Sequence, residues 1–340
     1  MAVVSRAWFV DRYGGPERLT LRERPNPSPA AGEVLVRTAA IGLNFADLFV
    51  RSGDYPRTPK TPFVPGMEIS GTVEALGEGV ASLTLGQRVV AVPLFGGHAE
   101  SVAVPVARVF PLPDGLDLVE AAAIPVVFLT AWYLCARAEV TAGDRVVVTA
   151  AAGGVGTALL QLLALREARA LALVGSEAKR SLCHELGAAQ TGLYEDAENL
   201  VDRVFSGKAD AVADAIGGRL FRRLWKRLAA GGRYVLYGFA AASGASGVAK
   251  LTAARELLAM GLFSPYSFVQ SCRTLIGFNL SLLPDRTGEL RRAAEEVLEL
   301  WKLGRIRPIL GPRFRFEQMP DAHRALAGRG TTGKVVIAVG

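Results

Sequence analysis

The feature that most constrains the fold is a run of twenty residues, 146–165, that contains no charged side chain. Its length alone would allow a helix to span a bilayer. The run opens with three valines, however, and glycines follow at 153, 154 and 156. A β-branched run, a glycine turn and an apolar segment are typical of a buried parallel strand followed by a helix that packs on the sheet. We therefore expect this run to lie inside a folded domain and not in a membrane.

The pattern of predicted secondary structure changes at about residue 118. Before about residue 118, short strand patterns such as Val34–Thr38 and Ile69–Ala75 are separated by glycine- and proline-rich turns, which predicts an antiparallel β unit. From about Leu118, helical patterns alternate with short aliphatic runs, as in the βαβ units of a doubly wound parallel sheet. A charged amphipathic helix over 287–303 then leads to a strand-like tail, which we expect to return to the first domain. An α/β fold with two domains is predicted.

The charge composition limits the kinds of molecule that the protein is expected to bind. The chain carries 39 Lys and Arg against 32 Asp and Glu, a net charge of +7. Its densest basic cluster, 219–227, alternates with apolar residues at helical spacing, which favours the solvated face of an amphipathic helix over a nucleic-acid surface. A phosphorylated cofactor or substrate explains the positive balance at least as well as DNA does. We predict a small-molecule substrate, with neither a nucleic-acid partner nor a membrane partner.

The cysteines indicate the compartment. Cys135, Cys183 and Cys272 are odd in number and far apart, which fits packed thiols in a reducing environment better than a disulfide framework. The N-terminus lacks the basic and long apolar regions of a secretion signal. A cytoplasmic location is expected.

The glycine turn indicates a nucleotide site. The sequence from Ala151 to Gly156 reads Ala-x-Gly-x-x-Gly, so the first glycine of the usual dinucleotide fingerprint is missing. Backbone without Cβ atoms can approach a pyrophosphate closely, and the positive end of the following helix attracts its charge. We predict that Gly153, Gly154, Val155 and Gly156 contact a dinucleotide; the alternative is a purely structural turn.

The next strand bears on the choice of cofactor. An NAD site puts a carboxylate about 20 residues beyond the glycines, on the ribose 2′-hydroxyl. Here the strand Ala170–Val174 ends in Gly175-Ser176 with no carboxylate at its tip, and Lys179 follows. Ser176 and Lys179 leave room and positive charge for a 2′-phosphate, which predicts NADPH. The alternative is that both residues only cap and solvate the next helix.

Four segments in order resemble the medium-chain dehydrogenase/reductases: Ile41–Asp47, Pro65–Glu68, Ala150–Gly156 and Gly333–Val336. Within that family the chain is similar to the zinc-free quinone oxidoreductase branch, and 239–280 resembles its vesicle amine transport protein homologues. The resemblance implies a GroES-like β domain from residues 1–120 and 284–340. It also implies a Rossmann NADPH-binding domain over 121–283, a cofactor in the cleft between the two, and a homodimer formed through an edge strand of the nucleotide sheets.

The zinc alcohol dehydrogenases of this family provide a contrast. They have a cysteine near the position of Asn44 and a histidine where this chain has Met67. An amide and a thioether cannot replace a thiolate and an imidazole at a catalytic zinc. His98, His184 and His323 have no partners at ligand spacing. We predict no metal.

Without a metal, the expected reaction is reduction of a C=C bond conjugated to a carbonyl, which needs a hydrogen-bond donor for the oxygen and a proton source. Asn44 resembles the family asparagine near the nicotinamide ribose. Tyr55 resembles the proposed proton donor of the enoyl-thioester reductases, although it could equally be an aromatic plug on a proline-rich loop. These two residues are the catalytic candidates.

The resemblance assigns further cofactor contacts, some of which have a structural alternative. Thr130 could instead cap its helix, the phenylalanines could be core residues, and Lys334 could be an exposed lysine at the start of a strand. The stretch Ala240–Gln270 is expected either to cover the substrate cleft or to form a dimer contact. The further contacts assigned are Thr130, Tyr194, Gly238, Phe239, Phe278, Asn279 and Lys334.

Three functions remain open. The leading one is an NADPH-dependent reductase of an enoyl thioester such as a short or branched enoyl-CoA, because Arg57 and Lys60 near Tyr55 could meet the CoA phosphates. A quinone or enone oxidoreductase is the second. The third is a non-catalytic dinucleotide-binding interaction protein.

Overall fold

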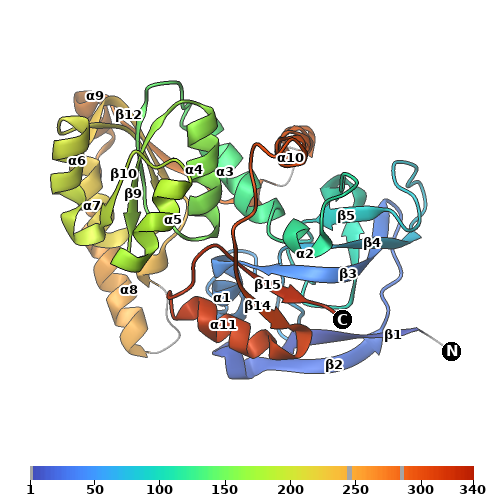
Figure 1. Ribbon diagram of the computed structural model, residues 1–340. Helices are drawn as coiled ribbons and strands as arrows, with labels where there is room; N and C mark the ends of the chain where they lie inside the picture. The colour runs from blue at the N-terminus through green and yellow to red at the C-terminus, as the bar shows by residue number, and fades with distance from the viewer. Residues whose placement is uncertain (1–2, 243–246, 284–286) are drawn as a thin grey trace. The chain divides into compact units, whose positions relative to one another are not determined.

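The computed structural model describes residues 3–242, 247–283 and 287–340 (Figure 1). Contacts divide the chain into two compact units, and the division at 129/130 falls inside helix α3 (Pro125–Arg137). We call them the β unit (Met1–Leu129 with Leu283–Gly340) and the parallel-sheet unit (Thr130–Leu282). The domain boundaries expected from the sequence stay a prediction. The second of them adjoins 284–286, and the stretch 240–270 includes 243–246; both short segments lie outside the described residues.

The β unit contains one large sheet and a two-stranded ribbon. Among the described residues the sheet has seven strands in the order β14-β15-β3-β4-β5-β7, with β6 also paired to β3, while β1 and β2 form the ribbon. Four helices accompany them. The bounds are β1 Val4–Val10, β2 Leu19–Pro25, β3 Glu33–Leu43, α1 Phe45–Ser52, β4 Ile69–Leu76, β5 Arg88–Ala91, β6 Ser101–Pro105, β7 Val109–Pro111, α2 Leu118–Ala121, α10 Thr287–Lys302, β14 Leu310–Arg315, α11 Met319–Ala327 and β15 Lys334–Ala338.

The C-terminal tail is part of the sheet of the β unit. Strand β15 pairs antiparallel with β3, with Val335 opposite Leu43 and Ile337 opposite Ile41. Both strands are almost wholly apolar and buried, as expected for strands covered on both faces. The register between two segments so distant in sequence decides which polar residues meet at the ends of these strands.

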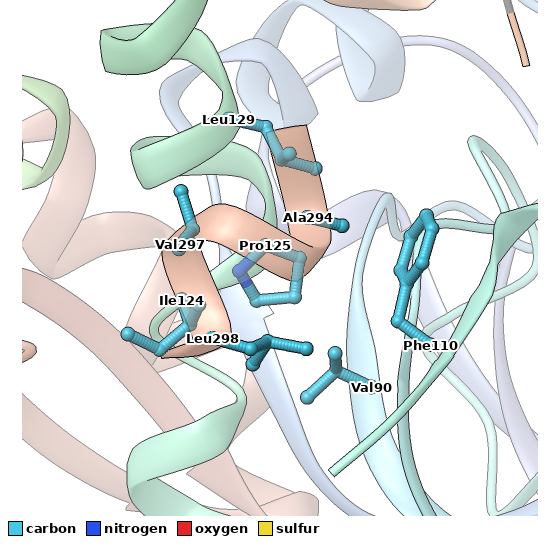
Figure 2. A pocket seen from close by; sticks show the side chains of 8 residues that line it. All are labelled: Val90, Phe110, Ile124, Pro125, Leu129, Ala294, Val297 and Leu298. Atoms are coloured by element: carbon cyan, nitrogen blue, oxygen red, sulfur yellow. The ribbon is translucent and has the colours of Figure 1, made fainter. Parts of the chain in front are cut away.

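Helix α10 packs on the β unit through Ala294, Val297 and Leu298, which share one helical face by their spacing. A narrow apolar void of about 10 Å³ remains between this face and the sheet, where Val90 of β5 and Phe110 of β7 also line it (Figure 2). The void is lined entirely by apolar side chains, so extra hydrocarbon is tolerated there.

Filling this void is expected to stabilise the protein. Val90→Ile adds one methylene, worth about 0.8 kcal/mol when fully buried, to the free energy of unfolding measured in urea. Val89→Ile is the matched control, because Val89 points to the other face of β5, into a closed core, where added volume strains the packing. The prediction would be contradicted if Val90→Ile were no more stable than the wild type. It would also be contradicted if Val89→Ile gained as much stability as Val90→Ile.

The parallel-sheet unit is a doubly wound α/β layer. Its described strands run β10-β9-β8-β11-β12-β13, and every neighbouring pair is parallel. In chain order this is 3-2-1-4-5-6, the dinucleotide-binding arrangement. The α/β fold class with a doubly wound, Rossmann-type parallel sheet is thus confirmed. The bounds are β8 Arg145–Val148, α4 Gly154–Leu165, β9 Arg169–Val174, α5 Arg180–Glu185, β10 Gln190–Leu193, α6 Ala197–Phe205, β11 Ala209–Asp214, α7 Gly218–Lys226, β12 Leu228–Leu236, α8 Gly247–Met260, α9 Pro265–Ser271 and β13 Thr274–Gly277.

The uncharged run 146–165 forms β8, a turn and α4, as its sequence predicts. Its valines lie between β9 and β11 in the middle of the sheet, and most of α4 is buried. In the part of the chain that the structure describes, no helix is both long and apolar enough to cross a membrane.

Candidate functional site

Three polar residues from distant segments meet at one end of the central strands of the β unit. Asn44 directly follows β3, Glu68 directly precedes β4, and Lys334 is the first residue of β15. Because β3 pairs antiparallel with both neighbours, the end of β3 lies beside the starts of β4 and β15. The register of the sheet therefore brings the three side chains together.

These side chains form a closed polar cluster, which we call the Asn-Glu-Lys cluster. The amide Nδ2 of Asn44 donates to Oε1 of Glu68 at 2.7 Å, and Nζ of Lys334 donates to Oδ1 of Asn44 at 2.6 Å. The Lys334 ammonium also forms an ion pair with Oε1 of Glu68. All three residues are buried, with exposed fractions of 7%, 0% and 3%. The alternative of an exposed lysine at a strand start is therefore wrong.

Glu68 is held on both carboxylate oxygens. Its Oε2 accepts the backbone N–H of Val126 at 2.7 Å, so the N-terminal turn of α3 contributes to its position. A Cβ at Gly42 would lie 2.7 Å from Oε1 of Glu68 and 2.2 Å from the carbonyl oxygen of Ala122, so only glycine allows this approach. Glu68 was not among the residues expected from the sequence, although it stands inside the quoted segment Pro65–Glu68.

Asp47 lies at the first turn of α1, beside the cluster. Its Oδ2 accepts the backbone N–H of Asn44 at 2.8 Å, which caps the helix, and its Oδ1 has no partner among the described residues. The side chain is fully buried. Burial raises the pKa of Asp47 to about 7, although the Asn44 N–H and the charge of Lys334 act in the opposite direction. This carboxyl is therefore poised between its two protonation states near neutral pH.

A zinc ion does not fit this cluster. Zinc sites use thiolate, imidazole and carboxylate ligands. Here an ammonium group already neutralises Glu68, Asn44 offers only an amide, and Met67 is part of the hydrophobic core. Across the described residues, no three His, Cys, Asp or Glu side chains gather in a way that could hold a metal.

Tyr55 lies in the loop after α1, in the same unit. Its ring is half-buried and packs on the hydrophobic core of the β unit, and its carbonyl oxygen accepts both the N–H and the hydroxyl of Thr58. Arg57, in the same turn, has a left-handed backbone with φ of 61°. The turn holds Tyr55 at the surface of the core, so the plug and proton-donor interpretations both stay open.

A second buried polar group lies in the β unit around α1 and α11. His323 Nδ1 is 2.9 Å from Nη1 of Arg51, and the rings of His98 and His323 meet edge to face with centroids 5.4 Å apart. Both histidines are fully buried, and neither nitrogen of His98 has a hydrogen-bond partner in the described chain. Burial lowers the pKa of His98 to about 3 and that of His323 well below its usual range, and nearby charges act in the same direction.

This pair predicts a loss of stability in acid. Each histidine has a pKa of about 6.5 when unfolded, so the unfolded chain binds more protons below that pH and the folded state is favoured less. Each contributes a slope of about 1.4 kcal/mol per pH unit as pH falls from about 6.5 towards the folded pKa. Asp47 has the opposite sign, because its raised pKa favours the folded state in acid and less so as pH rises to about 7.

The variant His98→Leu removes one titration without breaking a hydrogen bond. We expect the free energy of unfolding of this variant, measured in urea from pH 4 to 7, to depend less steeply on pH than that of the wild type. The difference in slope should correspond to about one bound proton. His184→Leu is the control, since His184 is exposed and lies outside the buried pair. A wild-type slope retained in His98→Leu would show that the buried pair does not carry the acid sensitivity.

In the parallel-sheet unit, the predicted glycine turn joins β8 to α4. Gly153 is the N-cap of α4, and Ala150 before it has a left-handed backbone with φ of 49°. A Cβ at Gly156 would lie 2.4 Å from the carbonyl oxygen of Ala150 and 2.5 Å from that of Ala151. Gly156 therefore permits the close packing of helix on turn. Because Gly153 has no side chain to cap the helix, the first amides of α4 are left for a ligand, and they lie at the point where strand order reverses between β8 and β11.

The tip of β9 places three predicted residues near one another. Ser176 begins the short 3-10 helix Glu177–Lys179, and it is exposed. The ring of Tyr194 lies against Gly175, since a Cβ there would be 3.5 Å from Cε2 of the tyrosine. Partial burial lowers the pKa of Lys179. A hydroxyl, an ammonium group and an aromatic ring thus border the end of β9, and no carboxylate ends this strand.

A buried carboxylate that the sequence did not reveal anchors the same edge of this sheet. Asp214 ends β11 and has no exposed surface. It accepts hydrogen bonds from the hydroxyls of Thr149 and Tyr234 and from the backbone N–H groups of Ile216 and Gly217. Burial nevertheless raises its pKa. Asp214 thereby ties the turn after β8 to the turn after β11.

The remaining expected contacts are held by local packing. Gly238 approaches the backbone of Ala215, and the ring of Phe239 lies against Gly217. Phe278 is a core residue stacked on Tyr133, and Asn279 caps the turn at Ser281 through its Oδ1. Thr130 is buried within α3. The packing of Phe278 fits the core alternative stated above, and the cofactor roles of all these residues stay predictions.

Comparison with known proteins agrees with this architecture. Residues 30–114 match the alcohol dehydrogenase GroES-like domain, and residues 186–337 match the zinc-binding dehydrogenase family. The chain is 31% identical to the human synaptic vesicle membrane protein VAT-1 homolog-like over 98% of this chain and 81% of that protein. It is 33% identical to bovine quinone oxidoreductase-like protein 2 over 93% and 88%.

Solved structures agree as well. The quinone oxidoreductase from Thermus thermophilus, whose complex with NADPH is known, superposes with a TM-score of 0.82 at 36% identity, covering 98% of this chain and 99% of that one. The chain therefore belongs to the medium-chain dehydrogenase/reductase superfamily, in its zinc-free branch of quinone oxidoreductase-like proteins and VAT-1 homologues.

Proposed function

We propose that the protein is an NADPH-dependent reductase of a C=C bond conjugated to a carbonyl. The observation that carries this proposal is the buried Asn-Glu-Lys cluster, a metal-free source of hydrogen-bond donors in a chain similar to a quinone oxidoreductase-like protein. The first turn of α4 supports the cofactor, because its amides, Gly153 and Gly156 fit a pyrophosphate. Bound NADPH would supply the hydride that reaches the β-carbon of the acceptor.

The hydrogen bonds of the cluster indicate a different role for each of its three residues. Asn44 uses Nδ2 on Glu68 and Oδ1 on Lys334, so its amide is largely committed inside the protein. An ammonium group has three donors, and Asn44 and Glu68 take two of those on Lys334. We therefore assign the remaining donor of Lys334 to the cofactor or to the carbonyl oxygen of the acceptor. Asn44 and Glu68 are positioning residues that hold this ammonium charged and oriented.

Tyr55 is the proposed proton source. A phenol is neutral at pH 7 and can donate to an enolate. The replacement Tyr55→Phe is the test, with kcat followed against pH. Loss of kcat with unchanged NADPH affinity supports the role, whereas wild-type kcat at every pH would assign Tyr55 to packing alone.

An enoyl thioester is the acceptor we favour, because the exposed Arg57 and Lys60 follow Tyr55 and suit the phosphates of CoA. A quinone or enone is the second candidate, which the name of the Thermus relative favours. Oxidation of NADPH by the purified protein, followed with a panel of enoyl-CoAs, quinones and enones, separates the two. Tight NADPH binding without oxidation by any acceptor would favour a non-catalytic binding protein.

A carboxylate introduced at the end of β9 is expected to reverse the preference for NADPH over NADH. Ser176→Asp places a negative charge where the 2′-phosphate is proposed to bind, and the Kd for NADPH should rise about tenfold or more relative to that for NADH. Ser28→Asp, on an exposed loop of the β unit, adds the same charge elsewhere and should leave the ratio unchanged. An unaltered ratio in Ser176→Asp would place the 2′-phosphate away from β9.

We also propose a homodimer in which β13 pairs with the same strand of a second copy. This strand is an edge of the parallel sheet, and Leu275 on it is 36% exposed. An open edge can pair with the same strand of a second copy. Sedimentation of the protein with Leu275 replaced by lysine should report a monomer if this edge forms the dimer.

A further inference from the structure

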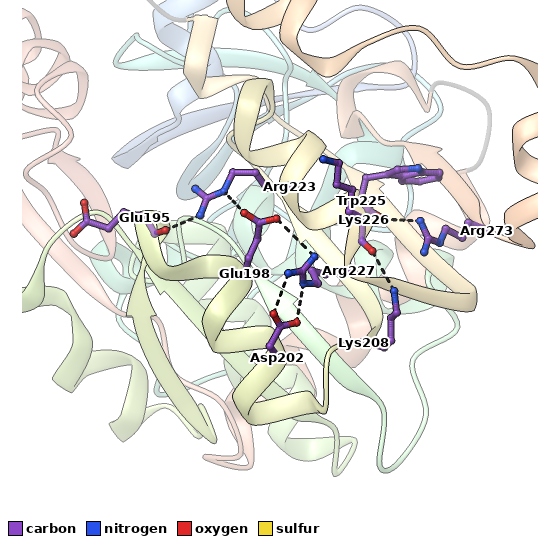
Figure 3. A network of polar contacts seen from close by, with 9 residues as sticks. All are labelled: Glu195, Glu198, Asp202, Lys208, Arg223, Trp225, Lys226, Arg227 and Arg273. Atoms are coloured by element: carbon purple, nitrogen blue, oxygen red, sulfur yellow. Dashed lines mark hydrogen bonds and ion pairs between the residues drawn. The ribbon is translucent and has the colours of Figure 1, made fainter.

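The cations of the basic cluster 219–227 differ in their partners, and Figure 3 shows the ion pairs of Arg223 and Arg227 with Glu198 and Asp202. Arg223 pairs with Glu198, and Arg227 pairs with Asp202 and Glu198, so these two cations bridge α7 to α6. The sequence led us to expect a solvated face, and for these two cations that expectation is wrong. Arg222 and Lys226 differ, because neither forms an ion pair with any described carboxylate. One turn of helix separates them, so both project from the same face of α7.

These two cations border a hollow of about 450 Å³ between α7 and α9, which we call the α7–α9 hollow. Trp225, Leu262 and Phe263 supply its apolar surface. Leu262 is fully exposed, and Phe263 packs edge to face on Trp225 with ring centroids 5.2 Å apart.

The floor of the hollow is rigid. Trp225 contacts Phe221 and Phe268 as well as Phe263, and the guanidinium of Arg273 lies over its ring at 5.9 Å. The same Arg273 donates to the carbonyl oxygen of Trp225 at 2.8 Å. Because this aromatic floor belongs to the core of the unit, its shape does not depend on a ligand.

Two of the three serine hydroxyls on the polar wall of the hollow already donate within the protein. The hydroxyls of Ser267 and Ser271 donate to backbone carbonyls of their own helix, and Oγ of Ser264 accepts the N–H of Ser267 at the start of α9. Nη1 of Arg222 donates to the carbonyl oxygen of Met260 at 3.3 Å, but no described carboxylate balances the charge of Arg222 or of Lys226. A ligand that complements the hollow carries one compact anionic group and an apolar body.

We propose that the α7–α9 hollow binds an alkyl carboxylate such as a fatty acid. The carboxylate meets Arg222, whose planar guanidinium can bind it through two hydrogen bonds, and Lys226 adds a second positive charge. The alkyl chain covers Trp225, Phe263 and Leu262. A compact inorganic anion would leave this apolar wall in water, and an uncharged alkane would leave the two cations unused.

Titration calorimetry of the full-length protein with dodecanoate tests the proposal. Dodecanoate should bind, and Arg222→Gln or Lys226→Gln should weaken its affinity by about tenfold, the loss of one hydrogen bond to a charged group. Arg219→Gln is the matched control on the same helix, because its side chain is exposed and pairs with Glu256 outside the hollow. Leu262→Ser, at a fully exposed position that does not endanger folding, should also weaken binding.

Three results would overturn the proposal. Equal loss of affinity in Arg219→Gln would reduce it to a general effect of charge. Displacement of dodecanoate by millimolar inorganic phosphate would assign the hollow to anions without a chain. Absence of binding together with self-association that Leu262→Ser weakens would assign the hollow to a second copy of the chain. The proposal is independent of the reductase activity, because every readout is binding.

Discussion

Replacing Lys334 by methionine is expected to lower the free energy of unfolding by about 3–5 kcal/mol, because the variant leaves the carboxylate of Glu68 buried without its counter-ion. The side chains of Lys334 and Glu68 are 3% and 0% exposed, so water cannot replace the lost partner. Asn44 would still donate to Glu68, but a neutral amide does not compensate a full charge. Urea unfolding at pH 7 measures the effect.

Two further variants make this result specific. The double variant Glu68→Gln with Lys334→Met removes both charges and should recover much of the lost stability, since the desolvation penalty disappears with the pair. Lys302→Met, at an exposed lysine that pairs with the exposed Glu299, should change the free energy of unfolding by less than about 1 kcal/mol. A Lys334→Met protein as stable as Lys302→Met would contradict the buried ion pair of Lys334 with Glu68 as a stabilising contact.

Replacing Gly156 by alanine is expected to destabilise the parallel-sheet unit and to impair nucleotide binding together. The added methyl group would lie 2.4 Å and 2.5 Å from two carbonyl oxygens of the turn, so α4 must shift away from it. Overpacking of this kind reduces the free energy of unfolding by about 1–3 kcal/mol. Because the proposed pyrophosphate site is the first turn of α4, the Kd for NADPH should rise by about tenfold or more.

Gly153→Ala provides the comparison. A Cβ at Gly153 would meet only the carbonyl oxygen of Ala150, at 3.2 Å, so a small adjustment accommodates it. We expect near-wild-type stability in this variant, while its added methyl group still crowds a bound pyrophosphate. Calorimetry with NADPH and thermal unfolding separate the two effects. If Gly156→Ala and Gly153→Ala were equally stable, the helix would not depend on the close approach at Gly156.

The sequence by itself determined the local chemistry of this protein. Three valines followed by glycines at 153, 154 and 156 predicted a buried strand, a turn and the start of a helix, because backbone conformation and hydrophobic period are properties of neighbouring residues. The missing carboxylate after Val174 predicted the phosphorylated cofactor in the same way. The family followed from four short motifs in order, and relatives over nearly the whole chain bear it out.

Only the tertiary structure decided which distant side chains meet. The register of β3 with β4 and β15 joins Asn44, Glu68 and Lys334, which are up to 290 residues apart, and it turns an ordinary strand-start lysine into half of a buried ion pair. Likewise, packing against α6 neutralises some cations of α7 and leaves Arg222 and Lys226 beside a hollow. Burial and pairing depend on contacts between elements, and residue type and spacing along the chain do not contain that information.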